Sequence, residues 1–444
     1  MKITRSLSVL LIFGVPMSFV HAQDLANEIT DLRQLLGEFQ ADYDARISDL
    51  EERLARAERQ AGNAQRDADE AIEIAEQTAI DQSSGSAAQN VFNPAIGSVV
   101  VARYGSVDQT WQEIPGFMPG GEIGPGGSGF SIGETDFNLA SSIDPNFFGN
   151  LTLAIGNDGG ETEVALEEAW VQTTNLPAGF SLTGGRFFSE AGYMNKFHRH
   201  ADDFADRPLP YQAFFGGQYI TDGIQVRWVA PAALLVELGA ELDWGAGFPA
   251  TANNSTAPAA VTVFTNIGGD VGISNSWQLG LSWLSADIMN RGGGNISDSF
   301  SGDSDLGTID FVWKWAPNGN PTVRNIKVQA EYFRRYEDGV FAGIPYDGDQ
   351  SGWYLQGVWQ FMQRWRAGYR HDVVDANNGP LFTGTILEDP GRSSRRDSLM
   401  IDWSLSEFSR LRMQFINDQV LPETDQQWFL QYIMSIGAHG AHEF

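Results

Sequence analysis

The chain has 444 residues, enough for one large domain and an accessory element, and it has no cysteine, which excludes disulfides and thiolate metal sites. Its 28 basic and 57 acidic residues give a net charge of −29, which argues against nucleic-acid binding because that needs a basic surface. Abundant Gly, Trp and Phe with a mean hydropathy of −0.23 favour strands that face lipid on one side and water on the other.

Residues 1–22 have the pattern of a cleaved signal peptide. Lys2 and Arg5 form a positively charged start, and residues 7–20 form an apolar stretch that is too short for a stable membrane span. Ala22 ends an acceptable cleavage site of small residues. The sequence therefore predicts export, with an uncleaved anchor as the alternative.

Residues 23–80 carry a helical pattern. Apolar residues recur at alternating steps of four and three from Leu25 to Ala75, the spacing that keeps one stripe facing a partner helix. A lone helix cannot bury this stripe, so we expect a self-associating periplasmic coiled coil. The alternative is a single solvated helix or a flexible acidic segment. Residues 81–91 read as a polar linker of small residues.

From residue 92 the hydrophobic period changes to two, the period of a β-strand. Trp365 and Tyr369, for example, alternate with Arg366 and Arg370. The pattern predicts an all-β transmembrane antiparallel barrel of about 16 strands over residues 92–444. A soluble β-sandwich is the alternative, but it would not place Trp, Tyr and Leu on every outward face. The predicted strands lie near residues 98–104, 134–142, 148–155, 164–173, 180–188, 223–229, 234–242, 261–269, 277–284, 308–315, 325–335, 353–361, 363–372, 398–405, 410–415 and 428–436.

Gly-rich, acidic connections are expected between some of these strands. They cover residues 115–129, 245–258, 290–306 and 375–395. Long connections that alternate with short turns are typical of the outer and periplasmic ends of a membrane barrel.

Four stretches resemble a family of Gram-negative porin-like proteins with an N-terminal coiled coil, some of which are described as zinc-regulated receptors or siderophore porins. They are FNPAI at 92–96, GRFFSEAGYMNKFHRHADDF at 185–204, DGIQVRW at 222–228 and GAHGAHEF at 437–444. The order of strand, inward-folding segment and returning strand over 185–228 also resembles, more weakly, the phosphate-selective porins. These resemblances imply a trimeric barrel with a constricting loop, and no plug domain of a TonB-driven receptor is expected.

The stretch from Ser189 to Gln218 is too long for a hairpin turn and is dense in charged and aromatic residues. Folded into the barrel, it would narrow the lumen, and the low-dielectric wall would focus the field of its charges. The alternative is an extracellular loop over the barrel mouth. Its candidate pore residues are Glu190, Lys196, Arg199, Asp202, Asp203, Asp206 and Arg207.

The arginines of the C-terminal strands are a second set of candidate pore residues. Arg364, Arg366, Arg370, Arg410 and Arg412 share the parity opposite to the apolar residues, and an arginine that faces hydrocarbon costs ~2–4 kcal/mol. We expect them on the lumen wall, where an acidic segment on the opposite side would give a transverse field. The alternative is that they only pair with acids of neighbouring strands.

His198 and His200 are candidate metal ligands. In an extended segment both imidazoles would share one face, and they could bind Zn²⁺ together with nearby carboxylates. The sequence supplies no certain fourth ligand, so it favours two polar residues in a wet loop and no cofactor. His439 and His442 fit better with a role in ending the last strand.

No Ser/His/Asp set, phosphate loop or pair of catalytic carboxylates is recognisable, so we do not expect an enzyme. The sequence predicts an outer-membrane porin for passive diffusion of small hydrophilic solutes, narrowed by an inward loop. Its expected partners are lipid, lipopolysaccharide, two further copies in a homotrimer, and the barrel assembly machinery, which would bind the strand ending at Phe444. Two alternatives stay open: a specific uptake porin for a metal ion or chelate, such as zinc or a siderophore, and an envelope-tethering barrel.

Overall fold

The structure is a computed structural model that describes residues 94–437, except 119, 122, 159–160, 246, 252–255 and 293–298, together with Gly37. The predicted signal peptide, the linker, and the coiled coil apart from Gly37 lie outside the described residues. So do His439, His442 and Phe444.

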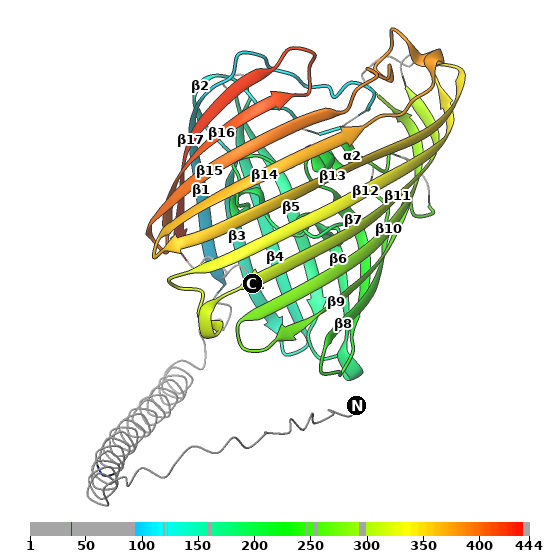
Figure 1. The fold of residues 1–444 in the computed structure, drawn as a ribbon. Coiled ribbons are helices and arrows are strands. Elements are labelled where there is room, and N and C mark those ends of the chain that lie inside the picture. The colour runs from blue at the N-terminus through cyan, green and yellow to red at the C-terminus, as the bar shows by residue number, and fades with distance from the viewer. Residues whose placement is uncertain are drawn as a thin grey trace, which may run out of the picture. The chain divides into compact units, whose positions relative to one another are not determined.

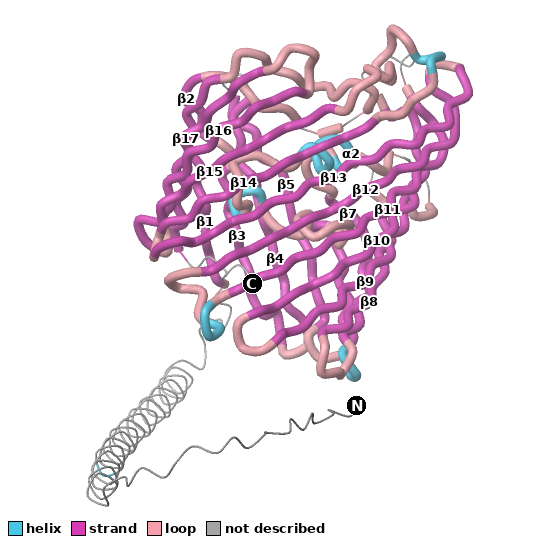
Figure 2. The backbone as a smooth tube through the Cα atoms, viewed as in Figure 1, coloured by secondary structure: helices cyan, strands magenta, loops and turns pink. Residues whose placement is uncertain are grey.

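The described chain forms a closed antiparallel barrel of sixteen strands with one short extra strand (Figures 1 and 2). The barrel closes where β1 pairs with β17, with Gly97 opposite Gly437. The other edge of β1 is shared by β2 and β3. The strands are β1 (Ala95–Ser106), β2 (Gly129–Ile132), β3 (Thr135–Asp144), β4 (Phe147–Asp158), β5 (Glu161–Thr173), β6 (Phe180–Phe188), β7 (Ile220–Val229), β8 (Leu235–Asp243), β9 (Ala260–Val271), β10 (Asn275–Arg291), β11 (Phe300–Trp315), β12 (Asn325–Phe341), β13 (Ile344–Met362), β14 (Trp365–Asp375), β15 (Ser394–Ser406), β16 (Ser409–Gln419) and β17 (Asp425–Gly437).

Each predicted strand overlaps one strand of the barrel, so the predicted fold class is confirmed. The four-residue β2 was not predicted, because it is too short to show an alternating pattern. Helices are few in the described part of the chain: α2 (Leu209–Phe215) and four three-residue 3-10 helices. None of the described helices has the length and hydropathy of a membrane span.

The two ends of the barrel differ in the length of their connections. The turns at the end where β1 begins and β17 ends are short. The turn at residues 145–146 is one of the shortest, and the turn at residues 316–324 is the longest. The longest connections lie at the other end, at residues 107–128, 189–219, 244–259 and 376–393. Short turns are periplasmic and long loops extracellular in outer-membrane barrels, so we refer to a periplasmic end and an outer end.

The connection expected over residues 290–306 is shorter than predicted. β10 continues to Arg291 and β11 already begins at Phe300. Some outward side chains in this part of the strands are acidic, as at Asp287 and Asp303, because the long strands continue beyond the apolar part of the wall. The prediction of a loop across all of these residues is therefore wrong.

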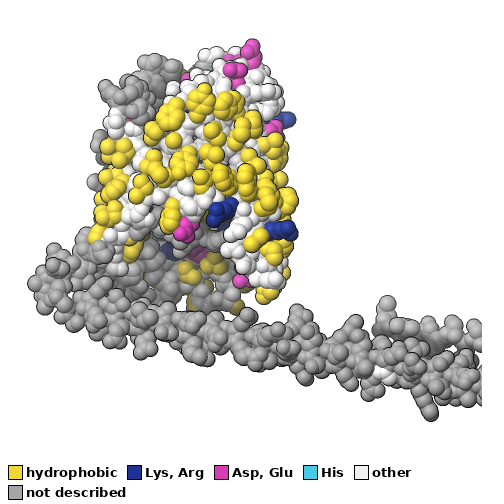
Figure 3. Space-filling model, turned by 90° about the vertical axis from the view of Figure 1, so that its left-hand side faces the viewer, with side chains coloured by type: hydrophobic (Ala, Val, Ile, Leu, Met, Phe, Trp, Pro, Cys, Tyr) yellow, Lys and Arg dark blue, Asp and Glu magenta, His cyan; other side chains and the backbone are white. Residues whose placement is uncertain are grey.

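Side chains alternate across the barrel wall as the period-two pattern predicts. On β12, Glu331, Phe333 and Arg335 are fully buried inside the barrel, whereas Tyr332 and Tyr336 face outward and are exposed. Exposed side chains elsewhere on the strands are mostly Leu, Ile, Val and aromatic residues, and Figure 3 shows them covering much of the wall. In a closed barrel every strand pairs with two neighbours, so the backbone polar groups are hydrogen-bonded within the wall. The apolar outer side chains can then face lipid, as a membrane requires.

A hydrophobic cluster occupies the interior near the outer end. It joins α2 to the connection over residues 107–128 and to the inner faces of β10 to β13. Phe214 of α2 lies between Phe117 and Phe333, with ring centroids 5.6 Å and 5.9 Å away. The connections of the outer end therefore fold partly into the barrel and pack there as a core (Figure 1).

Candidate functional site

Residues 189–219, between β6 and β7, fold back into the barrel and are called the inner segment here. Hydrogen bonds join the first and the last residues of the inner segment at the outer end. Ser189 N donates to Tyr219 O (3.2 Å), and Asn195 Nδ2 donates to the carbonyl oxygens of Ser189 (2.7 Å) and Tyr219 (2.8 Å). Tyr219 N donates to Asn195 Oδ1 (2.8 Å). The start and the end of the inner segment are thus tied together, and the stretch between them projects into the lumen.

The first contacts of the inner segment are with β7 and β8. Ser189 Oγ and Glu190 N donate to the carboxylate of Glu241, at 2.6 Å and 2.9 Å. Glu190 is paired with Arg227 and lies 3.7 Å from Lys196 Nζ. Burial raises the pKa of Glu190, but these two cations outweigh it and hold the pKa below its usual value. Glu190 therefore stays ionised inside the barrel.

The middle of the inner segment is held by α2 and by Glu331 of β12. Tyr211 Oη donates to Glu331 Oε2 (2.8 Å), and Tyr193 N donates to the same oxygen (2.9 Å). Gly216 ends α2 with a φ of 63°, a left-handed conformation that glycine adopts without strain. One buried carboxylate thus fixes two separate parts of the inner segment.

The tip of the inner segment lies against the wall formed by β14 to β16. Asp203 Oδ1 pairs with Arg366 Nη1 (2.9 Å), and Asp206 Oδ2 pairs with Arg370 Nη2 (2.9 Å) and with Arg396. The pKa values of both aspartates are lowered, because their cationic partners outweigh the effect of burial. These carboxylates are therefore ionised and neutralise the wall arginines directly.

Two further wall arginines bind the backbone of the inner segment. Arg410 Nη2 donates to His200 O (3.0 Å), and Arg412 Nη2 donates to Asp202 O (2.6 Å). The arginines and the acidic segment therefore lie on the same side of the lumen. The expected arrangement, with arginines opposite the acids and a transverse field between them, is wrong. Alternation along a strand predicts which way a side chain points, but it does not predict its partner.

Arg364 departs from the prediction in another way. It lies in the tight turn between β13 and β14 with a φ of 71°, and its Nη1 donates to Leu405 O (3.2 Å) at the surface. Because it precedes the strand, the alternation of β14 does not extend to it. It is not one of the lumen-facing residues.

The remaining candidates all belong to the inner segment. Arg207 pairs with Asp202 Oδ2 (2.8 Å) and donates to the carbonyl oxygens of Met194 and Phe197. Arg199 opens the single 3-10 turn Arg199–Ala201 and is half-buried. Burial raises the pKa of Asp202 to about 6. The interior therefore loses one negative charge as the pH falls below that value.

His198 and His200 meet three carboxylates of the facing wall. His198 Nδ1 lies 3.2 Å from Glu167 Oε2, and His198 Nε2 lies 3.1 Å from Glu168 Oε2. His200 Nδ1 lies 2.5 Å from Asp136 Oδ2. Burial lowers the pKa of His198, but its hydrogen bonds to the two glutamates outweigh this and raise the pKa to about 10. The inner segment is thus held on the β3–β5 side as well as on the arginine side.

A β-bulge brings the two glutamates together. Thr152 of β4 pairs with Glu168 and Leu153 pairs with Leu166, so Glu167 is an extra residue in β5. Both glutamate side chains are buried, and both reach His198, although neighbours on a regular strand would point to opposite faces. The bulge therefore doubles the negative charge beside His198.

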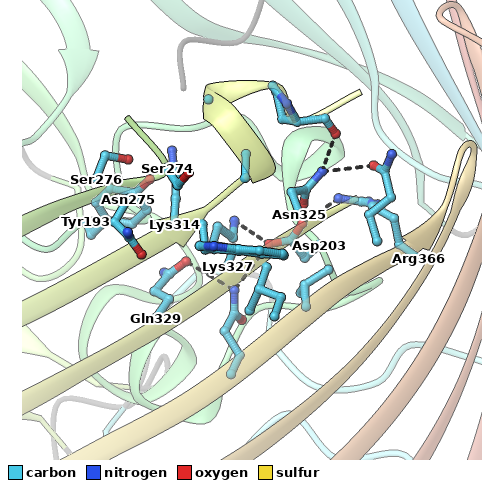
Figure 4. A pocket seen from close by; sticks show the side chains of 18 of the residues that line it. Tyr193, Asp203, Ser274, Asn275, Ser276, Lys314, Asn325, Lys327, Gln329 and Arg366 are labelled. Carbon is cyan, nitrogen blue, oxygen red and sulfur yellow. Dashed lines mark hydrogen bonds and ion pairs between the residues drawn. The ribbon is translucent and has the colours of Figure 1, made fainter. Parts of the chain in front are cut away.

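A cavity of about 850 Å³, lined by both apolar and charged side chains, lies between the tip of the inner segment and the periplasmic ends of β9 to β14 (Figure 4). Asp203 projects into it between Lys327 and Arg366 and is paired with both. Lys314 stands directly opposite Lys327 on the neighbouring strand. Asn325, Gln329, Gln356 and two serines, Ser274 and Ser276, add further polar groups to the lining.

The sequence predictions missed Asp136, Glu167, Glu168 and Glu331, which hold the inner segment in place. The adjacent glutamates carry a usable signal, because two acids in the middle of a strand interrupt its alternation. Asp136 and Glu331 carry no such signal, since each sits at a regular inward position.

No family model matches the sequence. An uncharacterised protein of Aquifex aeolicus is 28% identical over 338 residues, which cover 71% of this chain and 70% of that protein.

Three solved outer-membrane barrels share the fold at a TM-score of 0.50 each. A loop-deletion mutant of an outer-membrane protein of Vibrio cholerae is 11% identical and covers 78% of this chain and 99% of its own. An anion-selective porin from Comamonas acidovorans is 10% identical, with coverage of 78% and 99%. An outer-membrane channel of Acinetobacter baumannii is 10% identical, with coverage of 78% and 96%. The chain is thus similar to porin-type barrels in fold, and its apolar outer wall is that of a bacterial outer-membrane protein.

Proposed function

We propose that the protein is a porin through which small hydrophilic solutes diffuse passively across the outer membrane. The observation that carries this proposal is the cavity with charged lining residues beside the inner segment, within a closed barrel whose outer wall is apolar. Charged and amide side chains line the cavity, which is the chemistry that a water-filled path for polar solutes needs.

On this proposal the inner segment is the constriction. It contacts β7 and β8, β12, the arginine wall and the β3–β5 wall, so it crosses the lumen. Because Asp203 lies between Lys327 and Arg366 in the lining, the path carries close groups of both signs rather than one excess charge. A path of this kind admits polar solutes with little preference for one charge sign.

We also propose that three copies associate. The support is the apolar stripe of residues 23–80, which a single helix cannot bury. Recognition of the strand ending at Phe444 by the barrel assembly machinery stays a prediction from the sequence.

Osmotic swelling of proteoliposomes tests the porin proposal. We expect vesicles that contain the folded protein to swell in a pentose, more slowly in a disaccharide, and not in a large polysaccharide, because a lumen narrowed by the inner segment slows larger solutes. Vesicles reconstituted with the heat-denatured protein are the matched control. Entry of the pentose at the rate of the control would contradict the proposal, since a general porin cannot exclude so small a solute.

A further inference from the structure

The histidine and carboxylate cluster at the β3–β5 wall has the composition of a metal site. One ligand atom each from Asp136, Glu167 and His198 lies within 4.8 Å of the other two. The donors are an imidazole nitrogen and two carboxylate oxygens, a mixture that binds divalent transition metals. Glu168 and His200 stand beside them. The five side chains come from β3, the β5 bulge and the inner segment, so folding alone assembles them.

The distances between the donor atoms fit a small ion. His198 Nδ1 lies 3.2 Å from Glu167 Oε2 and 3.8 Å from Asp136 Oδ2. Ligands at about 2.0 Å around a tetrahedral Zn²⁺ ion are separated by roughly 3.3 Å, so His198 and Glu167 already fit, and a rotation of the Asp136 carboxylate that turns Oδ1 towards them would complete the set.

Asp136 supplies a second, independent observation. Its side chain is 4% exposed, and its Oδ1 has no hydrogen-bond partner among the described residues. A polar oxygen that is buried without a partner is costly unless a bound group compensates for it. The other oxygen, Oδ2, lies 2.5 Å from His200 Nδ1. His200 therefore orients Asp136 in the way that outer-shell groups orient the carboxylate ligands of metals.

We propose that Asp136, Glu167 and His198 form a binding site for a divalent transition-metal ion of the Zn²⁺ type, with His200 as a positioning residue. The ion would replace the proton on His198 Nδ1 as the positive partner of the carboxylates, and that proton would leave to solvent. Because its ligands belong to β3, β5 and the inner segment, the bound ion fastens the segment to the wall. The proposal does not depend on the porin function.

Calorimetric titration of the full chain in detergent with ZnCl₂, without an affinity tag, tests the site. We expect one Zn²⁺ per chain. The His200→Ala variant should bind about 10–100-fold more weakly, as is usual for the loss of an outer-shell partner, and His198→Ala should lose still more. Glu167→Gln keeps the size of the side chain and should also lose Zn²⁺ binding. It therefore still tests the site if a histidine variant does not fold.

His371→Ala is the matched control, because His371 pairs with Asp397 outside the cluster (2.8 Å) and its removal should leave binding unchanged. His439→Ala with His442→Ala controls for the C-terminal histidines. Absence of binding at millimolar Zn²⁺, or binding that survives both His198→Ala and Glu167→Gln, would overturn the proposal. Equal binding of Ca²⁺ and Zn²⁺ that is unchanged in His198→Ala would also overturn it, because it would indicate a site made of oxygen atoms alone.

Discussion

Replacing Asp203 and Asp206 together by alanine should release the tip of the inner segment and enlarge the channel. Arg370 and Arg396 are almost fully buried, and both pair with Asp206. The double variant removes the ion pairs between the tip and the wall, whereas Arg370 keeps Asp372 (3.0 Å) and Arg396 keeps Asp418 (3.3 Å), so the barrel itself should still fold. In planar bilayers we expect a several-fold larger single-channel conductance. The reversal potential across a salt gradient should shift towards anion preference, since the double variant removes two negative charges from the interior.

The matched control is Asp349→Ala, which removes the partner of Arg334 (2.9 Å) at the exposed outer surface and should change neither quantity. Heat-modifiable migration on a gel establishes that each variant still forms a barrel. A correctly folded double variant with the conductance and selectivity of the wild type would show that these pairs do not hold the segment.

The second large effect is expected on the outer wall. Leu281 of β10 and Leu399 of β15 are 44% and 58% exposed and face outward. In a membrane-embedded barrel, arginine at such positions costs ~2–4 kcal/mol each. The double variant Leu281→Arg and Leu399→Arg should therefore assemble poorly in lipid vesicles, measured as the fraction that migrates as the folded form without heating.

Leu381→Arg is the control for this effect, because Leu381 is 73% exposed but lies in the connection over residues 376–393 at the outer end. It should assemble like the wild type. Normal assembly of the Leu281 and Leu399 double variant would mean that these two positions do not face hydrocarbon.

The strands could be predicted because one physical constraint acts on every residue of the wall. Alternate side chains meet lipid and lumen, so the period of two persists along most strands, including those that carry Arg366 and Arg412, and is interrupted at the bulge of β5. The same reasoning fails where the wall leaves the membrane. At Asp287 and Asp303 the outward residues are acidic, and a strand resembles a loop in sequence.

The site could be predicted only in part, because its pairings are long-range. His198 and His200 stand out in the sequence, but their partner Asp136 lies more than sixty positions earlier, in β3. The bulge that turns Glu167 inward depends on the pairing of β4 with β5 and has no local period. Likewise, nothing near Asp203 or Asp206 in the sequence indicates that they contact the arginines rather than face them across the lumen.

The central claim, that solutes pass through the interior beside the inner segment, is tested most directly by a single introduced thiol. The chain has no cysteine, so Ser276→Cys places a unique thiol in the lining of the cavity, and Ser285→Cys places one on the outward face of the same strand. Single-channel current is recorded before and after addition of a charged methanethiosulfonate reagent. We expect the current of Ser276→Cys to fall and that of Ser285→Cys to stay unchanged. An unchanged current through Ser276→Cys whose thiol has reacted completely would contradict the account.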